Sequence, residues 1–388
     1  MRRISETFLV FLGLGLTSFG GPVAHLGYFH NAFVVRRNWL SDADYADLVA
    51  LCNFLPGPTS SQVGIAIGRR RAGWPGALAA FLGFTLPSVA LLYVVALGAG
   101  LWTGPLAAGI LHGLKLAALA VVAQAVWQMA QRLTPDWPRR ALAIAAAAIV
   151  LLLPQAAIPV LVITLAALAG AALYKGEAAA PIKLGHHPAA LTALAAFALL
   201  LLALPLLTTL TQQPALALID SFYRTGSLVF GGGHVVLPLL EAELVAPGLI
   251  DRDLFLAGYG AAQAVPGPLF SFAFYAGALV APPPNGIMGG LLALAAIYLP
   301  SFLLLAGTLP YWDQLKAIPR LRAALDLANA AVVGLLLAAL IDPILTSTIT
   351  AWPDPIIALA ALAALFLRVP PWLVVLACGT LGAGLTLL

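Results

Sequence analysis

Two short motifs place glycine next to a titratable side chain inside an otherwise apolar sequence. Phe-Gly-Gly-Pro at 19–22 is followed by a histidine, and so is Phe-Gly-Gly-Gly at 230–233. A helix that starts after such a break presents unpaired N–H groups and about half a positive charge at its N-terminus, where anions bind. The motifs therefore predict an anion site. Its candidate contacts here are Gly20, Gly21, His25, Gly231, Gly232, Gly233 and His234.

Pro-Gly-Pro turns at 56–58 and 266–268 form a second pair of breaks. Proline suits the first position of a helix, and glycine allows close backbone approach. Three hydroxyls and an amide follow the first turn at 59–62, whereas the second turn is followed by Leu-Phe, so the first copy would supply most polar contacts. Packed helix kinks are the alternative interpretation. The candidate contacts are Asn53, Gly57, Thr59, Ser60, Ser61, Gln62, Gln263, Gly267 and Ser271.

Three titratable residues are candidates to carry a coupling proton: His25, His234 and Glu241. Ionisable groups inside a membrane often serve function, and histidine changes charge near neutral pH. Each histidine could instead bond a carbonyl that the break frees, and Glu241 could simply lie at the membrane interface. Lys115 aligns by register with Asp326, which predicts either an ion pair between the two copies or a substrate contact.

Composition sets the class of protein that must position these residues. Of 388 residues, 62% are hydrophobic and 9% are charged, against about 25% charged residues in soluble domains. We expect an all-α polytopic membrane protein. Cys52 and Cys378 would be small apolar fillers, and Ser41 with Asp44 would cap a helix. The apolar runs that predict membrane spans are 74–102, 105–131, 141–153, 157–174, 189–210, 286–309, 323–341 and 371–388.

The chain contains an internal duplication at an offset of about 210–213 residues. The breaks at 19–22 and 56–58 recur at 230–233 and 266–268, and Pro-Ser at 87–88 recurs at 300–301. We expect a first repeat at 1–174, a polar loop and one linking helix at 175–213, and a second repeat at 214–388. Each repeat would hold two short broken hairpins, at 5–35 and 41–68 in the first copy, followed by four full spans. The arms at 43–55 and 58–68 are too short to cross singly, which favours re-entry.

Charge predicts the orientation of the two repeats. With a cytoplasmic N-terminus, all 19 Lys and Arg residues lie in cytoplasmic loops except Arg224, Arg252 and Lys115. This positive-inside bias indicates that the second repeat is inverted relative to the first. The net charge of +4 then reflects loops that face an anionic leaflet, so no nucleic-acid partner is expected. Inverted repeats with broken helices are a recurrent transporter design, with the site near the midplane.

The motifs resemble those of the chromate ion transporter family. The matching stretches are SFGGPVAHLGYF, LCNFLPGPTSSQVGIAIG, GSLVFGGGHVVLPLLE and AAQAVPGPLFSFAFYAGAL. The resemblance covers essentially the whole chain and implies a secondary transporter in the bacterial inner membrane. Its expected substrate is chromate, exported from the cytoplasm with chromate resistance as the result. Gly233 replaces Pro22 at the second break, which weakens strict two-fold equivalence there.

Two other functions compete with chromate export. The same scaffold could carry sulfate or exchange chromate for sulfate, since the two anions share shape and charge. A membrane-embedded enzyme would show a redox cofactor motif, a metal-ligand cluster or an acid–base pair, and the sequence contains none of these, nor a phosphate-binding loop for ATP. We therefore expect no enzyme activity, no cofactor and no metal. The bilayer is an expected partner, and a second copy of the chain is a further candidate.

Overall fold

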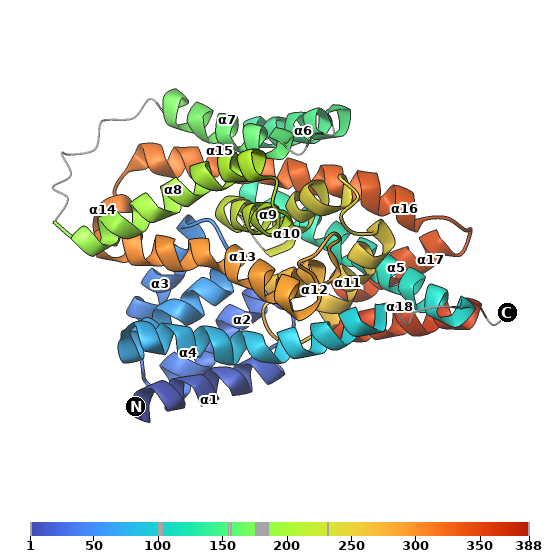
Figure 1. Cartoon of the computed structure of the whole chain (residues 1–388), viewed down its shortest axis with the longest axis horizontal. Coiled ribbons are helices and arrows are strands. Elements are labelled where there is room, and N and C mark those ends of the chain that lie inside the picture. The colour runs from blue at the N-terminus through green and yellow to red at the C-terminus, as the bar shows by residue number, and fades with distance from the viewer. Residues whose placement is uncertain are drawn as a thin grey trace.

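The computed structural model describes residues 2–99, 104–153, 155, 157–174, 186–230 and 233–386. These residues are almost entirely helical and include no β-strand (Figure 1). Within them, five helices are long and apolar enough to cross a membrane, which confirms the all-α polytopic class. They are Thr59–Gly98, Pro105–Leu133, Pro188–Thr211, Gly286–Leu315 and Pro319–Thr348. Gly231, Gly232 and most of the polar loop, 175–185, lie outside the described residues.

The helices of the first copy run in the expected order. They are α1 (Arg2–Thr17), α2 (Gly21–His30), the π-helix η1 (Asn31–Arg36), α3 (Asp42–Phe54), α4 (Thr59–Ala99), α5 (Pro105–Leu133), α6 (Trp137–Leu152) and α7 (Ala157–Leu173). The linking helix is α8 (Pro188–Thr211). α4 contains a kink at Ala72 and Gly73, where the sequence predicts a loop between a short arm and a full span.

The second copy repeats this order with more subdivision. It comprises α9 (Pro214–Leu228), η2 (Gly233–Val235), α10 (Val236–Leu240), η3 (Glu241–Val245), α11 (Arg252–Ala264), η4 (Leu269–Ser271), α12 (Phe272–Leu279), α13 (Gly286–Thr308), η5 (Leu309–Tyr311), α14 (Trp312–Leu315), α15 (Pro319–Ala339), η6 (Leu340–Leu345), α16 (Thr346–Thr348), α17 (Asp354–Phe366) and α18 (Pro371–Leu385). The helix breaks therefore lie at the predicted motifs in both copies.

Two local predictions need correction. Pro58 and Pro268 do not occupy the first helical position, because α4 starts at Thr59 and η4 at Leu269. Pro268 has extended backbone, with ψ of 132°, and the Pro58 carbonyl accepts the Gln62 N–H at 2.9 Å, so both prolines are N-cap residues. The expectation of four full spans per copy is also wrong in part. α6, α7, α17 and α18 have 16, 17, 13 and 15 residues, fewer than the roughly 20 that a span needs.

The predicted cap at the start of α3 is confirmed. The Asp44 N–H donates to the Ser41 hydroxyl at 3.1 Å, and Asp251 caps α11 in the same way through the Leu254 N–H at 3.0 Å. Hydrogen bonds from Ser41 and Arg70 hold the pKa of the Asp44 carboxyl below its ordinary value. Equivalent helices in the two copies thus begin with the same capping chemistry.

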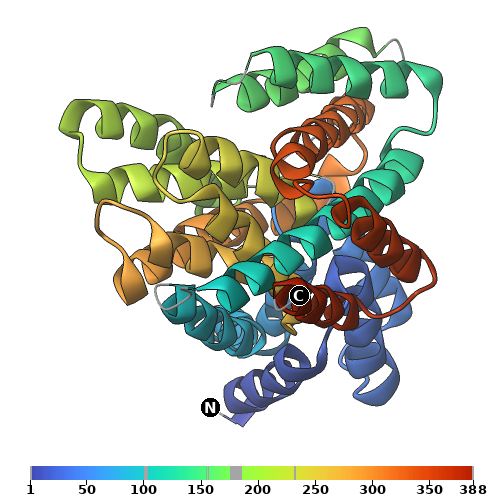
Figure 2. The same cartoon turned by 90° about the vertical axis from the view of Figure 1, so that its right-hand side faces the viewer.

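Long helices of one copy pack on short helices of the other. α5 crosses α17 and α18, while α15 crosses α6 and α7, as Figures 1 and 2 show. Glycine permits the contact of α5 with α18, because a Cβ on Gly113 would meet the Cys378 carbonyl. In the equivalent crossing of α15 with α7, a Cβ on Gly170 would meet the Ala323 carbonyl. The two halves are therefore intertwined.

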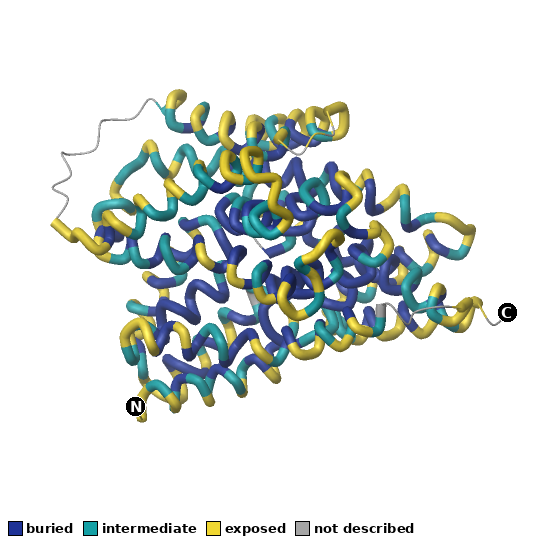
Figure 3. The backbone as a smooth tube through the Cα atoms, in the orientation of Figure 1, coloured by how far each residue is buried: buried dark blue, intermediate teal, exposed yellow. Residues whose placement is uncertain are grey.

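Burial follows this arrangement. Buried residues concentrate where the two halves meet, and the outer faces of α7 and α8 are exposed (Figure 3). Leu202 and Leu210 on α8 are 75% and 72% exposed, as expected for side chains that face lipid. Cys52 and Cys378 are buried and free, which confirms their role as apolar fillers.

Candidate substrate site

Each Pro-Gly-Pro turn is bonded to the glycine break of the other half. The Gly57 N–H donates to the Val229 carbonyl at 2.7 Å, and the Gly267 N–H donates to the Ser18 carbonyl at 2.9 Å. Val229 and Ser18 occupy equivalent positions, just before the two Phe-Gly-Gly motifs. The hydrogen bonds are thus reciprocal, and they gather all four breaks at the centre of the molecule.

Both turns require glycine for two independent reasons. φ is +121° at Gly57 and +103° at Gly267, a region that other residues rarely adopt. A Cβ on Gly57 would lie 2.8 Å from Ser301 Oγ, and one on Gly267 would lie 3.1 Å from Ser88 Oγ. Ser88 and Ser301 belong to the repeated Pro-Ser pair. The two glycine amides are therefore occupied by protein carbonyls and are not free to hold an anion in this structure.

The starts of α2 and η2 face each other across the centre. A Cβ on Gly233 would lie 3.4 Å from Pro22 Cγ, and these two residues occupy equivalent positions. Thr85 likewise lies against the hydroxyl of its own equivalent, Tyr298. Contact between equivalent residues marks a two-fold axis, so the breaks surround an approximate axis that relates the halves.

His25 is fully enclosed beside this centre. Its Nε2 lies 3.3 Å from the Ser18 carbonyl, and its Nδ1 lies 3.3 Å from Ser60 Oγ. Because a carbonyl only accepts, Nε2 carries the proton and Nδ1 of the neutral ring accepts from the Ser60 hydroxyl. His25 and Gly267 therefore converge on the Ser18 carbonyl, and with Ser60 on the other side both ring nitrogens of the histidine are engaged.

The other buried candidates also bond within the protein. Gln62 Nε2 donates to the Pro56 carbonyl at 2.6 Å and to Ser301 Oγ at 3.3 Å, while its Oε1 is buried without a hydrogen-bond partner. Ser271 Oγ lies 2.6 Å from Ser88 Oγ. Ser61 Oγ lies 3.4 Å from the Tyr298 hydroxyl. These side chains hold the centre together.

A smaller group of candidates is accessible. Asn53 is exposed at the last turn of α3, and Thr59 at the start of α4 is half-buried. Gly20 is exposed, with left-handed backbone at the N-cap of α2. His234 is half-buried, and its Nδ1 lies 2.7 Å from the Tyr259 hydroxyl, which Gln263 also faces. These residues are the predicted contacts that are accessible in the structure.

Glu241 lies away from the centre, 3.6 Å from Arg252 at the start of α11. The equivalent positions of the first copy hold His30 and Asp42, whose side chains are 2.7 Å apart. The two pairs tie the end of one broken segment to the start of the next in each copy. Glu241 also lines a cavity of about 130 Å³ together with Asp342 and Gln155.

The predicted pairing of Lys115 with Asp326 is wrong. Lys115 Nζ donates to Asp253 at 2.7 Å and to the Ser347 carbonyl at 3.2 Å, whereas Asp326 accepts from Arg139 at 3.0 Å. Alignment of the two copies identifies equivalent residues. Two equivalent residues contact each other only if both lie close to the two-fold axis that relates the copies. Lys115 and Asp326 lie away from the axis.

Sequence reasoning missed several partners of the site. Ser88, Ser301, Tyr259 and Tyr298 contact the predicted residues, yet none was a candidate. A signal existed for the two serines, because the Pro-Ser pair recurs in both copies. The tyrosines lie in apolar segments, and no sequence pattern there marks them as partners of the site.

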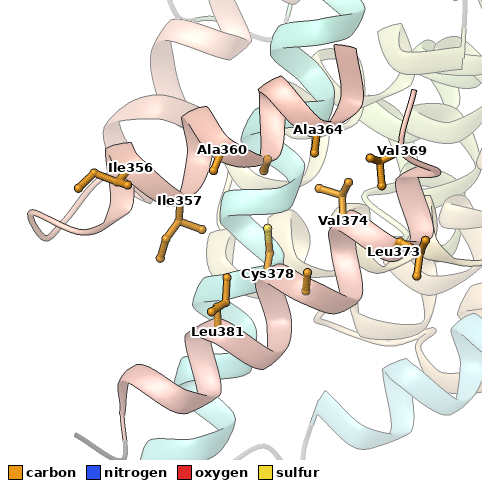
Figure 4. A pocket seen from close by; sticks show the side chains of 11 residues that line it. Ile356, Ile357, Ala360, Ala364, Val369, Leu373, Val374, Cys378 and Leu381 are labelled. Atoms are coloured by element: carbon orange, nitrogen blue, oxygen red, sulfur yellow. The ribbon is translucent and has the colours of Figure 1, made fainter. Parts of the chain in front are cut away.

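An apolar pocket between α17 and α18 does not suit an anion. It has a volume of about 460 Å³ and is lined by aliphatic side chains and Cys378 (Figure 4). An oxyanion there would lose its hydration without gaining hydrogen-bond donors. This pocket therefore gives no support for an anion site.

Comparison with known protein families matches both halves of the chain to one model. The family model described as chromate transporter matches residues 5–171 and again 216–383. The chain belongs to the chromate transporter family. The same family model thus matches both halves whose breaks are bonded to each other, and the two matches together cover most of the chain.

Relatives in this family are similar along most of their length. The chromate transport protein of Pseudomonas aeruginosa is 28% identical over 357 residues, which cover 87% of this chain and 80% of that protein. The chromate transport protein of Cupriavidus metallidurans is 29% identical over 351 residues, or 87% and 82% of the two chains. An uncharacterized transporter of Methanocaldococcus jannaschii is 24% identical over 337 residues, or 85% and 82%. No solved structure matches the chain.

Proposed function

We propose that this family member is a secondary transporter that exports chromate across the bacterial inner membrane, with its N-terminus in the cytoplasm. The observation that carries the proposal is the reciprocal bonding of the Pro-Gly-Pro turns. Those bonds bring the starts of α2, α4, η2 and η4 to one central place. Four helix starts oriented in this way favour a negative charge there.

The accessible donors suit a tetrahedral oxyanion. The amide of Asn53 and the first N–H groups of α2 and α4 can each bond one oxygen, and the Thr59 hydroxyl can bond another by giving up its long, 3.4 Å bond to the Cys52 carbonyl. Asn53 and Thr59 flank one Pro-Gly-Pro turn, and Gly20 precedes α2 with its backbone exposed. These donors are neutral, so release of the anion does not require separation of a tight ion pair.

The membrane potential can drive export without ATP. Moving one elementary charge through 100 mV is worth about 2.3 kcal/mol, so expulsion of a dianion from an inside-negative cell gains about 4–5 kcal/mol. That free energy supports a concentration gradient above about a thousandfold. Chromate resistance of the cell would follow from such export.

Proton coupling would add to this driving force, and His234 is the stronger candidate. Its Nδ1 bonds the Tyr259 hydroxyl and its ring is half-buried, whereas both nitrogens of His25 are engaged in a closed pocket. Glu241 is paired with Arg252 away from the centre. We therefore assign the proton to His234 if export is coupled to protons.

Sulfate is the alternative substrate, because hydroxyl, amide and backbone donors recognise shape and charge rather than the central atom. Counterflow in proteoliposomes separates the two: vesicles loaded with unlabelled chromate or sulfate receive labelled chromate outside. Chromate export predicts strong uptake against internal chromate and weak uptake against internal sulfate. Equal uptake would indicate an oxyanion exchanger, and uptake no greater than in protein-free vesicles would contradict transport.

A further inference from the structure

α3 and α11 occupy equivalent places in the two copies but differ in what covers them. Each has 13 residues, begins with a capping residue and ends at a Pro-Gly-Pro turn. At an offset of 210, Asp47, Ala50 and Asn53 of α3 correspond to Ala257, Gly260 and Gln263 of α11. These three positions lie on one helical face, at a spacing of three residues.

The α11 face is sealed by α5. Leu256 and Ala257 are 0% and 1% exposed, and Gly260 is so close to α5 that a Cβ there would meet the Leu114 carbonyl. Lys115 on α5 adds the ion pair with Asp253 at the start of α11. The lysine side chain is only 7% exposed. The ion pair therefore holds α5 against α11 and keeps the lysine charge buried.

The corresponding face of α3 is open. Ala43, Ala46, Asp47, Ala50 and Asn53 are all exposed, and these positions follow the helical repeat from the start of α3 to the Pro-Gly-Pro turn. Leu48, Leu51 and Cys52 on the opposite face are buried. α3 therefore presents a continuous exposed stripe that ends at the candidate site.

The residue types indicate that this stripe faces water rather than lipid. It consists of alanines, an aspartate and an asparagine, whereas the exposed positions of α8 include Leu199, Leu202 and Leu210. A carboxylate and an amide in contact with hydrocarbon would each be strongly destabilising. Asp47 would repel an anion, but Lys316 Nζ lies 3.3 Å from its carboxylate and offsets that charge.

The residue types at equivalent positions explain the difference between the two faces. Position 43 is alanine where Asp253 stands in α11, and Asp326 stands where α5 has Lys115. The ion pair that fastens α5 to α11 therefore has no counterpart on the α3 side. Ala50 also carries the methyl group that Gly260 lacks, so α15 cannot approach α3 as closely as α5 approaches α11.

From these observations we propose that the exposed stripe of α3, residues 43, 46, 47, 50 and 53, lines the aqueous route by which an oxyanion reaches the site from the cytoplasm. The Lys115–Asp253 pair is the gate that closes the opposite route along α11. The proposal rests on the proposed transport function and on a cytoplasmic N-terminus. It assigns Asn53 as the first protein donor that an arriving anion meets.

Sided cysteine labelling tests the route. In a Cys52→Ala, Cys378→Ala background, three single variants are compared: Ala50→Cys on the stripe, Ala257→Cys as the sealed counterpart, and Leu202→Cys as a lipid-facing control. A membrane-impermeant charged methanethiosulfonate is added to inside-out or right-side-out vesicles. We expect Ala50→Cys to react at least tenfold faster than the other two, and only from the cytoplasmic side. Equal rates for Ala50→Cys and Leu202→Cys would overturn the route.

The gate is tested by combining Ala257→Cys with Asp253→Asn or with Lys115→Met. Each should raise labelling of Ala257→Cys from the outer side at least tenfold, and a monodisperse elution profile shows that the variant is folded. Two folded double variants that label no faster than Ala257→Cys alone would overturn the gate. Added chromate should slow labelling of Ala50→Cys. Fast labelling that chromate leaves unchanged would preserve the route and instead contradict the proposed substrate.

Discussion

The amide nitrogen of Gly57 lies 2.7 Å from the carbonyl oxygen of Val229, a residue 172 positions later in the chain. The equivalent bond runs from Gly267 to Ser18 at 2.9 Å. Each half thus supplies a turn that the other half holds in place. The helix starts at the centre are positioned by main-chain hydrogen bonds, which no side-chain substitution removes directly.

Substitution of either central glycine should disrupt this arrangement. Gly57→Ala or Gly267→Ala places a side chain at positive φ, which costs about 1–2 kcal/mol, and adds contact with Ser301 or Ser88. We expect a lower thermal midpoint and loss of transport. Gly13→Ala is the matched control, since nothing lies within 4 Å of its Cβ position in α1. A Gly57→Ala protein as stable and active as the control would contradict the account.

The Ser88–Ser271 pair should behave as a coupled unit. The Ser88 hydroxyl donates to the Thr85 carbonyl at 2.8 Å, so the Ser271 hydroxyl, 2.6 Å away, donates to Ser88, and Ser88→Ala leaves this buried donor unbonded at a cost of about 1–3 kcal/mol. Ser88→Ala and the double alanine variant should therefore be almost equally destabilised. A double-mutant cycle on thermal or denaturant unfolding measures this coupling, and strictly additive losses would exclude it.

The two partners of the gate should differ in their effect on stability. Asp253→Asn leaves a lysine that is 7% exposed without its partner, whereas Lys115→Met leaves an aspartate that is 58% exposed and can be hydrated. An unpaired buried charge is strongly destabilising, so Asp253→Asn should lower the unfolding midpoint more than Lys115→Met. The comparison needs only unfolding curves in one detergent, and the reverse order would show that Lys115 is already hydrated.

The two histidines should separate in their effect on pH dependence. His25→Asn removes hydrogen bonds to Ser18 and Ser60 in a closed pocket and should lower stability while the pH profile of flux keeps its shape. His234→Asn should flatten that profile, because His234 is the assigned proton carrier. Flux is measured between pH 4 and 8, so that titration well below the ordinary pKa of histidine, about 6.5, is also detected. A profile unchanged by His234→Asn would remove this residue from coupling.

Many features of this fold can be predicted from short stretches of the sequence. Gly-Gly and Pro-Gly-Pro breaks, the Ser41 cap and the long apolar runs each depend on neighbouring residues, so their places were predictable. The register of the duplication even pointed to the two Pro-Ser pairs. The orientation of the halves in the membrane stays a prediction.

The rest depends on how the two halves meet. No local pattern indicates that the Gly57 amide bonds Val229, or that Lys115 chooses Asp253 over Asp326, because these contacts join segments more than 130 residues apart. The difference between α3 and α11 is likewise visible in the residue types only once the partner helix is known. From the sequence alone, nothing distinguishes a glycine such as Gly260, which packs directly against a backbone carbonyl, from the alanine at the equivalent position in the other copy.

Potential-driven uptake of labelled chromate into inside-out proteoliposomes tests the central claim most directly. A positive potential inside the lumen reproduces the outside of the cell, so it should drive accumulation that falls several-fold when an ionophore collapses the potential. Asn53→Ala should abolish accumulation while the protein still reconstitutes. Uptake that is indifferent to the potential, or no greater than in protein-free vesicles, would contradict export of a dianion through this chain.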